Sequence, residues 1–524
     1  MQPLNWNQPY PSSRSPVCAA NVVATSQPLA TQAGLDALRR GGNAVDAALA
    51  AAIALTVVEP NNNGLGSDAF CLLWDGDAVV GLNASGRAPA AWTAERFAGR
   101  ERMPALGWDA VTVPGAVSAW VALSDRYGRL PFATLFEPAV AYAETGFQVG
   151  PKTAYYWQQA ARTLGGFEGF RRHFLPAPAA GARFRRPDLA RSLRLIADSR
   201  GESFYRGELA ERMVAAASAD GGALSAEDLA SHQADWVTPL TQRYRDAALH
   251  EIPPNGQGLA ALLGVAILDH MDAPPLDSAD SVHLQIEAMK IAVRAAFDHL
   301  ADIDAMRLPP EALLAPAMVA RLARGIGRRA APVPPAPLPV SADTVYLCAA
   351  DADGMMVSFI QSNYQGFGSG VVIPETGISL QNRGHGFSLD PDHPNRVGPR
   401  KRPFHTIIPG FATDADGAPR LAFGVMGGHM QHQGHLQMMV RLFDHGQNPQ
   451  AASDAPRWHI YPDYRIGLET GFSEAVAADL ASRGHDVRHE PLEHVFGGAQ
   501  LILRTADGYV AGSDHRKEGQ AAGF

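Results

Sequence analysis

The sequence predicts an α+β protein, because helical and strand-like patterns occupy separate stretches of the chain. Helical stretches are an apolar run at 44–58 and a longer part, mainly helical, from about 116 to 326. Runs of strand-forming residues follow at 69–74 and 78–82, and again from 344 onward. With 46% hydrophobic and 19% charged residues among 524, the chain is globular and long enough for one large or two ordinary domains.

The N-terminal part is predicted to consist of an arm, two helices and a hairpin. Residues 1–17 are rich in Pro, Ser and Asn and are expected to form a flexible arm. A helix over about 29–40 is ended by a Gly-Gly pair, and Asn43 then caps the apolar run at 44–58. That run contains an aspartate and is too short for a membrane span, so a buried helix is expected. An Asp-Gly-Asp turn at 75–77 predicts a hairpin between the two strands that follow.

The main boundary of the chain is a proline-rich tether at 331–340, APVPPAPLPV. Such a segment fits neither a helix nor a central strand. Directly after it, 344–350 (TVYLCAA) is predicted to be a strand, with a returning strand over 355–361. Short strands and glycine-rich turns continue from there, with helices near 433–444 and 473–483. A strand that begins with threonine therefore opens just beyond a flexible tether.

Thr344 is placed to become a catalytic nucleophile if the bond before it is cut. A threonine hydroxyl is a weak nucleophile alone, but a new α-amino group with a pKa of roughly 7.7–8.0 can serve as its base. The same hydroxyl would cleave the chain by attack on the Asp343 carbonyl, through an N-to-O acyl shift. Position alone favours an ordinary strand residue at Thr344, since threonine is common in strands.

Charge and cysteine content exclude several classes of protein. The net charge of −9 argues against nucleic-acid and anionic-membrane partners. No CxxC pair occurs among Cys18, Cys71 and Cys348, so neither a disulfide framework nor a zinc ribbon is expected. The N-terminus lacks an apolar stretch behind a basic start, so no secretory signal is predicted and a cytoplasmic location is expected.

A series of motifs runs in order along nearly the whole chain: 28–60, 64–67, 113–115, 144–147, 350–354, 367–370, 401–403 and 427–428. From about Asn21 onward these motifs resemble the γ-glutamyltransferase family of N-terminal-nucleophile hydrolases. Residues 359–362 (FIQS) and 381–384 (QNRG) are most similar to its glutathione hydrolase-like and oxamate amidohydrolase branch.

The resemblance implies a four-layer αββα sandwich and a proenzyme that cleaves itself. The large chain would cover 18–343 and the small chain 344–524, and the two would remain one structural unit as a heterodimer that can dimerise further. Neither cofactor nor metal is implied. Thr344 falls on the family's catalytic threonine.

The resemblance also implies catalytic roles for three further positions. Gly427 and Gly428 fall on the glycines whose backbone N–H groups hold the oxyanion. Ser362 stands where the family has a threonine that hydrogen-bonds the nucleophile, and it keeps the hydroxyl. The second threonine that commonly follows the nucleophile is replaced by Val345.

The substrate pocket departs from the family pattern. The family pairs a γ-glutamyl α-carboxylate with an arginine and the α-amine with an acid. Here Ser85 stands at the arginine position, with Arg87 two residues further on, and Gly386 stands at the acid position. Arg383 replaces a neighbouring glutamine. A pocket that loses its acid and gains an arginine should disfavour an ammonium group. We therefore expect a small carboxylate-bearing amide as substrate, bound by Arg383 and Arg87.

Three more pocket positions differ from the family. Tyr364 stands where the family has an asparagine, and His405 and Thr406 stand where it has a pair of serines. Three of the pocket residues, Tyr364, His405 and Arg383, have a structural alternative. Tyr364 would then be packing at a strand edge, His405 a satisfied core histidine, and Arg383 a partner in a salt bridge. The segment 387–403 is short and Pro-rich where relatives carry a lid, which predicts an open cleft and favours hydrolysis over transfer.

Two other functions remain open from the sequence. One is true γ-glutamyl chemistry, as a glutathione hydrolase or transferase that uses other contacts for the amine. The other is an unprocessed family member that only binds its ligand. A metal site at His429, His432 and His435 is disfavoured, because no nearby carboxylate completes a ligand set. These histidines are expected to support the turn of Gly427 and Gly428.

Overall fold

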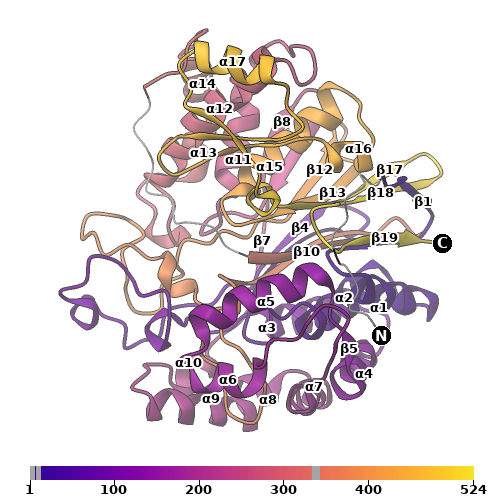
Figure 1. Cartoon of the computed structure of the whole chain (residues 1–524), viewed down its shortest axis with the longest axis vertical. Coiled ribbons are helices and arrows are strands. Elements are labelled where there is room, and N and C mark those ends of the chain that lie inside the picture. Colours follow the sequence, from indigo (N-terminus) through magenta and orange to yellow (C-terminus); the bar gives the residue numbers. More distant parts are fainter. Residues whose placement is uncertain (1–5, 7–12, 333–342) are drawn as a thin grey trace.

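The centre of the molecule is a pair of seven-stranded antiparallel sheets stacked face to face, with helices over both outer faces (Figure 1). The computed structural model describes residue 6 and residues 13–332 and 343–524. The layers follow one another as helix, sheet, sheet, helix. The predicted α+β fold, a four-layer αββα sandwich, is confirmed.

The first sheet has the hairpin of β10 and β11 at its middle. In order across the sheet, its strands are β19 (Gln520–Gly523), β2 (Val22–Thr25), β10 (Asp343–Ala350), β11 (Met356–Tyr364), β3 (Asp68–Trp74), β4 (Val79–Asn83) and β7 (Asp235–Val237). The hairpins β3–β4 and β10–β11 lie where the sequence predicts them.

The second sheet lies over the first. Its strands, in order, are β1 (Val17–Ala19), β18 (Gly508–Ser513), β17 (Gly498–Thr505), β13 (Pro419–Met426), β12 (Gly410–Asp414), β9 (Ala247–Glu251) and β8 (Leu240–Tyr244). The hairpin β8–β9 and strand β7 lie inside the stretch that the sequence predicts to be mainly helical. The alternating burial of β8 and β9 is that of strands with one face toward the core.

Each outer layer is a group of helices. Against the first sheet lie α1 (Pro28–Arg39), α2 (Ala44–Val58), α3 (Ala116–Tyr127), α4 (Glu137–Thr145) and α7 (Pro187–Ser199). Against the second lie α11 (Gly258–Leu268), α12 (Ala279–Phe297), α14 (Pro316–Ala323) and α15 (Met430–Met439). Further helices are α5 (Pro151–Leu164), α6 (Glu168–Phe174), α8 (Glu202–Tyr205), α9 (Glu208–Ala219), α10 (Ala226–Ala230), α13 (Pro310–Leu313), α16 (Pro449–Asp454) and α17 (Glu474–Ser482).

The side chains of β10 point alternately to the two faces of its sheet and so belong to two different layers of the core. Val345, Leu347 and Ala349 face the helices of the first layer, whereas Tyr346 and Cys348 face the second sheet. Successive residues of a strand point to opposite faces, so a strand buried on both sides is apolar throughout. This burial holds the start of β10 between two packed layers.

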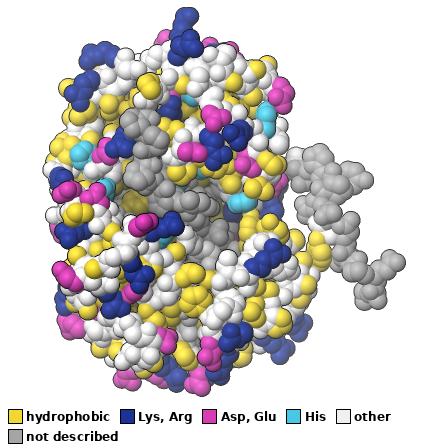
Figure 2. All heavy atoms as spheres, turned by 60° about the vertical axis from the view of Figure 1, so that its left-hand side comes forward, with side chains coloured by type: hydrophobic (Ala, Val, Ile, Leu, Met, Phe, Trp, Pro, Cys, Tyr) yellow, Lys and Arg dark blue, Asp and Glu magenta, His cyan; other side chains and the backbone are white. Residues whose placement is uncertain are grey.

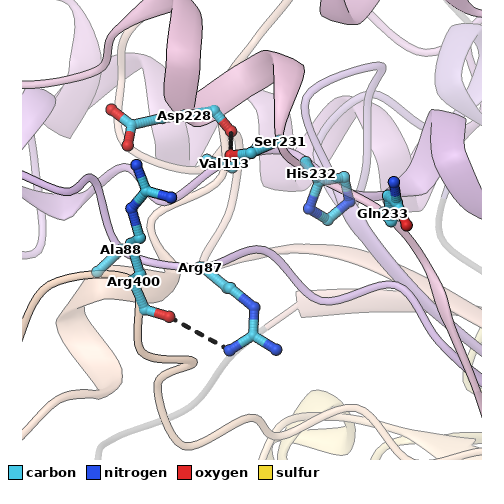
Figure 3. A pocket seen from close by; sticks show the side chains of 8 residues that line it. All are labelled: Arg87, Ala88, Val113, Asp228, Ser231, His232, Gln233 and Arg400. Carbon is cyan, nitrogen blue, oxygen red and sulfur yellow. Dashed lines mark hydrogen bonds between the residues drawn. The ribbon is translucent and has the colours of Figure 1, made fainter.

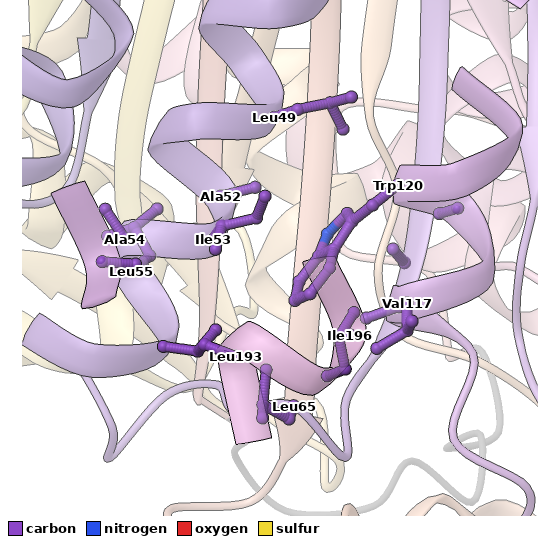
Figure 4. Close-up of a cluster of buried hydrophobic side chains, with 14 of the residues drawn as sticks. Leu49, Ala52, Ile53, Ala54, Leu55, Leu65, Val117, Trp120, Leu193 and Ile196 are labelled. Carbon is purple, nitrogen blue, oxygen red and sulfur yellow. The ribbon is translucent and has the colours of Figure 1, made fainter. Parts of the chain in front are cut away.

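Helix α2 carries the largest part of the first core. Asn43 caps its N-terminus with its side chain, as predicted, in a reciprocal pair with Asp46. All its residues are buried, and Figure 4 shows Leu49 and Ile53 directed toward Trp120 of α3. Gln361 of β11 donates to the Ala52 carbonyl at 2.8 Å, which ties the helix to the central hairpin.

Two predicted segments fall largely outside the described residues, namely most of the arm at 1–17 and of the tether at 331–340. The described end of the arm is held by Arg14, which donates to the Gly519 carbonyl at 2.9 Å. Within the described ranges, no helix combines the length and apolarity needed to cross a bilayer. On the face drawn in Figure 2, charged side chains of both signs are scattered among apolar ones.

Candidate active site

Thr344 is the second residue of β10, in the middle of the first sheet. Its side chain is buried, and its Oγ1 donates to Ser362 Oγ on β11 at 3.2 Å. Asp343 pairs with Tyr364 and Val345 with Gln361, so that two residues of β11, at 362 and 363, stand opposite the single residue Thr344. Bulges re-aim side chains and often lie beside active sites. Here the bulge lies in β11, directly opposite the predicted nucleophile.

Tyr364 ends β11 and lies between Ser362, the contact of Thr344, and Arg383. It has a positive φ of 77°, which is uncommon for a residue with a side chain. Its N–H donates to Ser362 Oγ at 2.8 Å, so that the serine contacts both Thr344 and Tyr364. The guanidinium of Arg383 lies over the Tyr364 ring, 4.7 Å from its centroid. Burial raises the pKa of Tyr364 to about 12, so its hydroxyl is neutral.

Arg383 is a buried cation with unused donors. Only 1% of the residue is exposed. Its Nη1 donates to Thr406 Oγ1 at 2.7 Å, while Nε and Nη2 have no hydrogen-bond partner among the described residues. Burial lowers the pKa of Arg383 to about 10, which leaves it charged near neutral pH. Unpaired donors on a buried charge are costly unless a ligand satisfies them.

His405 and Asp68 form a buried pair behind Arg383. Nε2 of His405 lies 3.1 Å from Asp68 Oδ2, and its Nδ1 accepts from the Ile407 N–H at 3.3 Å. Burial raises the pKa of Asp68 to about 7 and lowers that of His405 well below its usual value. Both ring nitrogens of His405 are thus engaged within the protein, as in a structural histidine.

Sequence reasoning missed Asp68. Its Oδ1 accepts from the N–H groups of Gly86 and Gly115, at 3.2 and 3.0 Å. Its negative charge acts on Arg383. The available signal was its place directly after the glycine-rich motif at 64–67.

Gly427 and Gly428 form a turn just after β13. Both have positive φ, 135° and 60°, and a Cβ at position 427 would lie 2.9 Å from the Gly497 Cα. Neither N–H donates a hydrogen bond within the described part of the chain. β13 packs on β10, since a Cβ at Gly424 would lie 2.5 Å from the Tyr346 ring. The turn therefore offers two unused N–H donors at the end of a strand packed on β10.

Gln257 connects this turn to the arginine pocket. Its Nε2 donates to the carbonyls of Gly428 at 2.8 Å and Thr406 at 2.5 Å. Its Oε1 lies 2.9 Å from His432 Nδ1. No sequence pattern pointed to Gln257, because its partners are distant in the chain. A continuous set of contacts thus runs from Thr344 through Ser362, Tyr364, Arg383, Thr406 and Gln257 to Gly428.

Ser85 and Arg87, the other predicted pocket residues, make different contacts. Ser85 Oγ donates to Asn83 Oδ1 at 2.8 Å inside a buried amide network. Arg87 pairs with Asp302 at 3.2 Å and its side chain is 40% exposed. It lines a separate cavity of about 280 Å³ together with Arg400 and His232 (Figure 3). The structure gathers Arg383, Tyr364 and Thr406, but it does not direct Arg87 to them.

Gly386 leaves no space for an acidic side chain. A Cβ at this position would lie 2.6 Å from the Phe404 carbonyl oxygen. Gly386 borders a cavity of about 850 Å³, which the segment 385–390 lines together with 101–105 and Phe404. This cavity lies where an open cleft was predicted.

The three histidines after the glycine turn have separate roles. His435 Nδ1 lies 2.6 Å from Glu251 Oε1, His432 contacts Gln257, and His429 stacks on Phe404 with ring centroids 5.8 Å apart. No group of side chains in the described ranges has the arrangement of a metal site. His432 is linked to the Gly428 carbonyl through Gln257 and His429 follows Gly428 directly, as expected for support of this turn, whereas His435 pairs with Glu251 of β9.

Two antiparallel sheets between helical layers, with a threonine near the start of a central strand, define the N-terminal-nucleophile class of hydrolases. The model of the γ-glutamyltranspeptidase family matches residues 30–524, and the chain belongs to this family. It is accordingly an enzyme, an N-terminal-nucleophile amidohydrolase.

Known relatives cover almost the full chain. The glutathione hydrolase-like YwrD proenzyme of Bacillus subtilis (strain 168) is 36% identical over 98% of this chain and 100% of its own length. The oxamate amidohydrolase proenzyme of Klebsiella pneumoniae is 38% identical over 95% of this chain and 97% of its own. The crystal structure of cephalosporin acylase from Bacillus halodurans superposes with a TM-score of 0.95 at 47% identity, covering 99% of both chains.

Proposed function

We propose that the chain is a proenzyme cut between Asp343 and Thr344, and that Thr344 then hydrolyses amides whose acyl group carries a carboxylate. The observation that supports this substrate is Arg383, which is buried and charged and has unused donors at Nε and Nη2. A carboxylate can accept from both donors at once, the arrangement in which arginine binds carboxylates most strongly.

Self-cleavage and catalysis use the same hydroxyl in this proposal. Thr344 Oγ1 attacks the Asp343 carbonyl carbon, the C–N bond breaks, and the nitrogen becomes the free α-amine. Water hydrolyses the resulting ester and leaves Asp343 as a new C-terminus. Ser362, in hydrogen-bond contact with Oγ1, orients the hydroxyl.

Substrate hydrolysis follows the same sequence with the α-amine as base. The amine takes the Oγ1 proton as the oxygen attacks the amide carbonyl, and the N–H groups of Gly427 and Gly428 stabilise the oxyanion. The C–N bond breaks, the proton passes to the leaving amine, and water releases the acid from the ester.

Hydrolysis of γ-glutamyl compounds is the second candidate, because YwrD is named a glutathione hydrolase-like protein. It would require a partner for the substrate ammonium. The close approach of Gly386 to Phe404 leaves no room for one at that position, and the charge on Arg383 opposes an ammonium nearby.

Intact mass and N-terminal sequencing of the purified protein, beside Thr344→Ala, test the first step. Two fragments are expected, the second beginning at Thr344, and a single chain in the variant. The processed enzyme is then given oxamate, other half-amides of small diacids and a γ-glutamyl anilide. Preference for the anilide would refute the carboxylate assignment, and an uncut chain without turnover would indicate a binding protein.

A further inference from the structure

Asp68 and Arg383 are two buried groups of opposite charge that lie near each other. Asp68 begins β3 and stands opposite Ser362 of β11 in the register of the sheet. A parallel bridge between Gly66 and Leu380 brings together the two segments that lead to Asp68 and Arg383. After burial, the charge of Arg383 is the largest influence on the pKa of Asp68, and the converse also holds.

The carboxylate of Asp68 is occupied by donors other than Arg383. Its Oδ1 accepts from the N–H groups of Gly86 and Gly115, and its Oδ2 contacts Nε2 of His405. Since Nδ1 of His405 accepts from a backbone N–H, its Nε2 carries the proton and donates to Asp68. Asp68 therefore offsets the charge of Arg383 from a distance and leaves Nε and Nη2 of the arginine free for a ligand.

A substrate carboxylate on Arg383 would bring a second negative charge close to Asp68. Two carboxylates that share one cation repel each other, so the bound substrate increases the proton affinity of Asp68. Burial already raises the pKa of Asp68 to about 7, so its carboxyl group can take up a proton near neutral pH. Once Asp68 is protonated, Arg383 attracts the substrate carboxylate without competition.

The other ionisable groups around Asp68 in the described ranges keep one charge state near neutral pH. His405 is neutral, because burial lowers its pKa well below the usual value. Burial raises the pKa of Tyr364 to about 12 and also raises that of Tyr205, so both hydroxyls stay neutral. Arg402 is a cation in a salt bridge. A proton taken up on binding therefore goes to Asp68.

We propose that Asp68 sets the selectivity for acidic substrates through Arg383, as its buried counter-ion, and that a substrate carboxylate binds together with one proton. The inference rests on the proposed function and deepens it. Asp68 is a positioning residue that does not touch the substrate, and its charge decides how strongly Arg383 attracts a carboxylate. The proton on Asp68 takes no part in the breaking of bonds and returns to water when the product leaves.

The pH dependence of substrate selectivity tests this coupling. The kcat/KM of processed enzyme for an acidic half-amide is divided by that for the neutral amide of the same chain length. Only the neutral α-amine of Thr344 reacts with either amide, so its titration cancels in the ratio. As pH rises through the ionisation of Asp68, the ratio should fall roughly tenfold, because the new negative charge weakens carboxylate binding.

A matched pair of variants assigns this fall to one residue. Asp68→Asn removes the charge and keeps an oxygen acceptor for the two backbone N–H groups. Its ratio should stay constant with pH and lie roughly tenfold above that of the wild type at the alkaline end. Asp46→Asn is the control, because Asp46 is also buried and accepts from three backbone N–H groups. This control should keep the wild-type profile.

The possible failures can be told apart. Asp68→Ser, which keeps a hydroxyl acceptor, takes the place of Asp68→Asn if that variant is not processed. A ratio that does not change with pH in the wild type, or a fall that persists without the Asp68 carboxyl group, would overturn the inference and leave the proposed function standing. Absence of turnover of every acidic amide by processed enzyme would instead overturn the proposed function, and the inference with it.

Discussion

Arg383 combines three properties that are seldom found together in a purely structural arginine. It is buried, it stacks on Tyr364, and the single hydrogen bond that its side chain makes within the described residues goes to the neutral hydroxyl of Thr406. The structural alternative for this residue was a salt bridge. A salt bridge would have engaged Nε or Nη2, but neither atom has a hydrogen-bond partner among the described residues. The pocket is therefore complementary to an anion that the chain does not supply at those atoms.

Removal of the Arg383 cation should selectively impair the hydrolysis of acidic substrates. Arg383→Gln is expected to lower kcat/KM for an acidic half-amide roughly 100-fold, because a charge-assisted pair in a buried site is lost. The neutral amide with the same chain length should change far less. Steady-state kinetics on both compounds measures the ratio. Arg87→Gln is the matched comparison, and a selective loss there but not at Arg383 would move the carboxylate site to the cavity of Figure 3.

Gln257 is expected to act as a positioning residue without touching the substrate. Gln257→Met removes both donated hydrogen bonds, to the carbonyls of Gly428 and Thr406, while it keeps the volume. The oxyanion turn should then lose its fixed position, so kcat falls at least tenfold and self-cleavage slows, with a smaller change in KM. The exposed Gln32→Met serves as control. Equal changes in kcat and KM, or only a lower melting temperature, would contradict this role.

At the scale of elements, the sequence predicted what depends on local pattern. The capped helix α2, the hairpins β3–β4 and β10–β11, and helices α15 and α17 follow from apolar periodicity and turn residues. The short strands β7, β8 and β9 were missed, because they interrupt a long helical stretch, and because β7 and β9 pair with strands that are remote in the chain. Arg383 was found from a motif, whereas Asp68 and Gln257 depend on contacts that only the folded chain creates.

At the C-terminal end of α2, a buried carboxyl group should make the stability of the protein depend on pH. Glu59 caps this end and is buried, accepting from Ser26 Oγ and Asn62 Nδ2 at 2.5 Å each. Burial raises the pKa of Glu59 to about 7, above its unfolded value. The folded protein thus retains a proton between about pH 4.5 and 7 that the unfolded chain releases, so this group's contribution to stability falls as pH rises through that window.

Glu59→Gln should remove this dependence. The melting temperature of the variant relative to that of the wild type is expected to rise by a degree or more between pH 5 and pH 8. At pH 8 the wild type carries a buried charge on Glu59, whereas the variant carries none. Parallel thermal scans of both proteins across this range measure the difference. A constant difference at all pH values would show that Glu59 does not titrate in this window.

At the scale of the whole molecule, strands from both sides of the proposed cleavage site are interleaved. In the first sheet, β10 and β19 flank β2, and β11 lies against β3. In the second, β18 pairs with β1 and β12 with β9. Each of these pairs joins a strand before residue 343 to one from the proposed small chain. Neither chain can therefore bury its apolar faces alone.

The cleaved protein should accordingly behave as one folding unit. Size-exclusion chromatography with light scattering should give the same mass for processed enzyme and for uncut Thr344→Ala, and the two fragments should separate only in denaturant. Both proteins should also lose secondary and tertiary structure together on heating, because the strand pairs across the cut are the shared core. The uncut variant is the control for any further dimerisation, which would raise both masses equally. Release of either fragment from the processed enzyme under native conditions would contradict a single interleaved core.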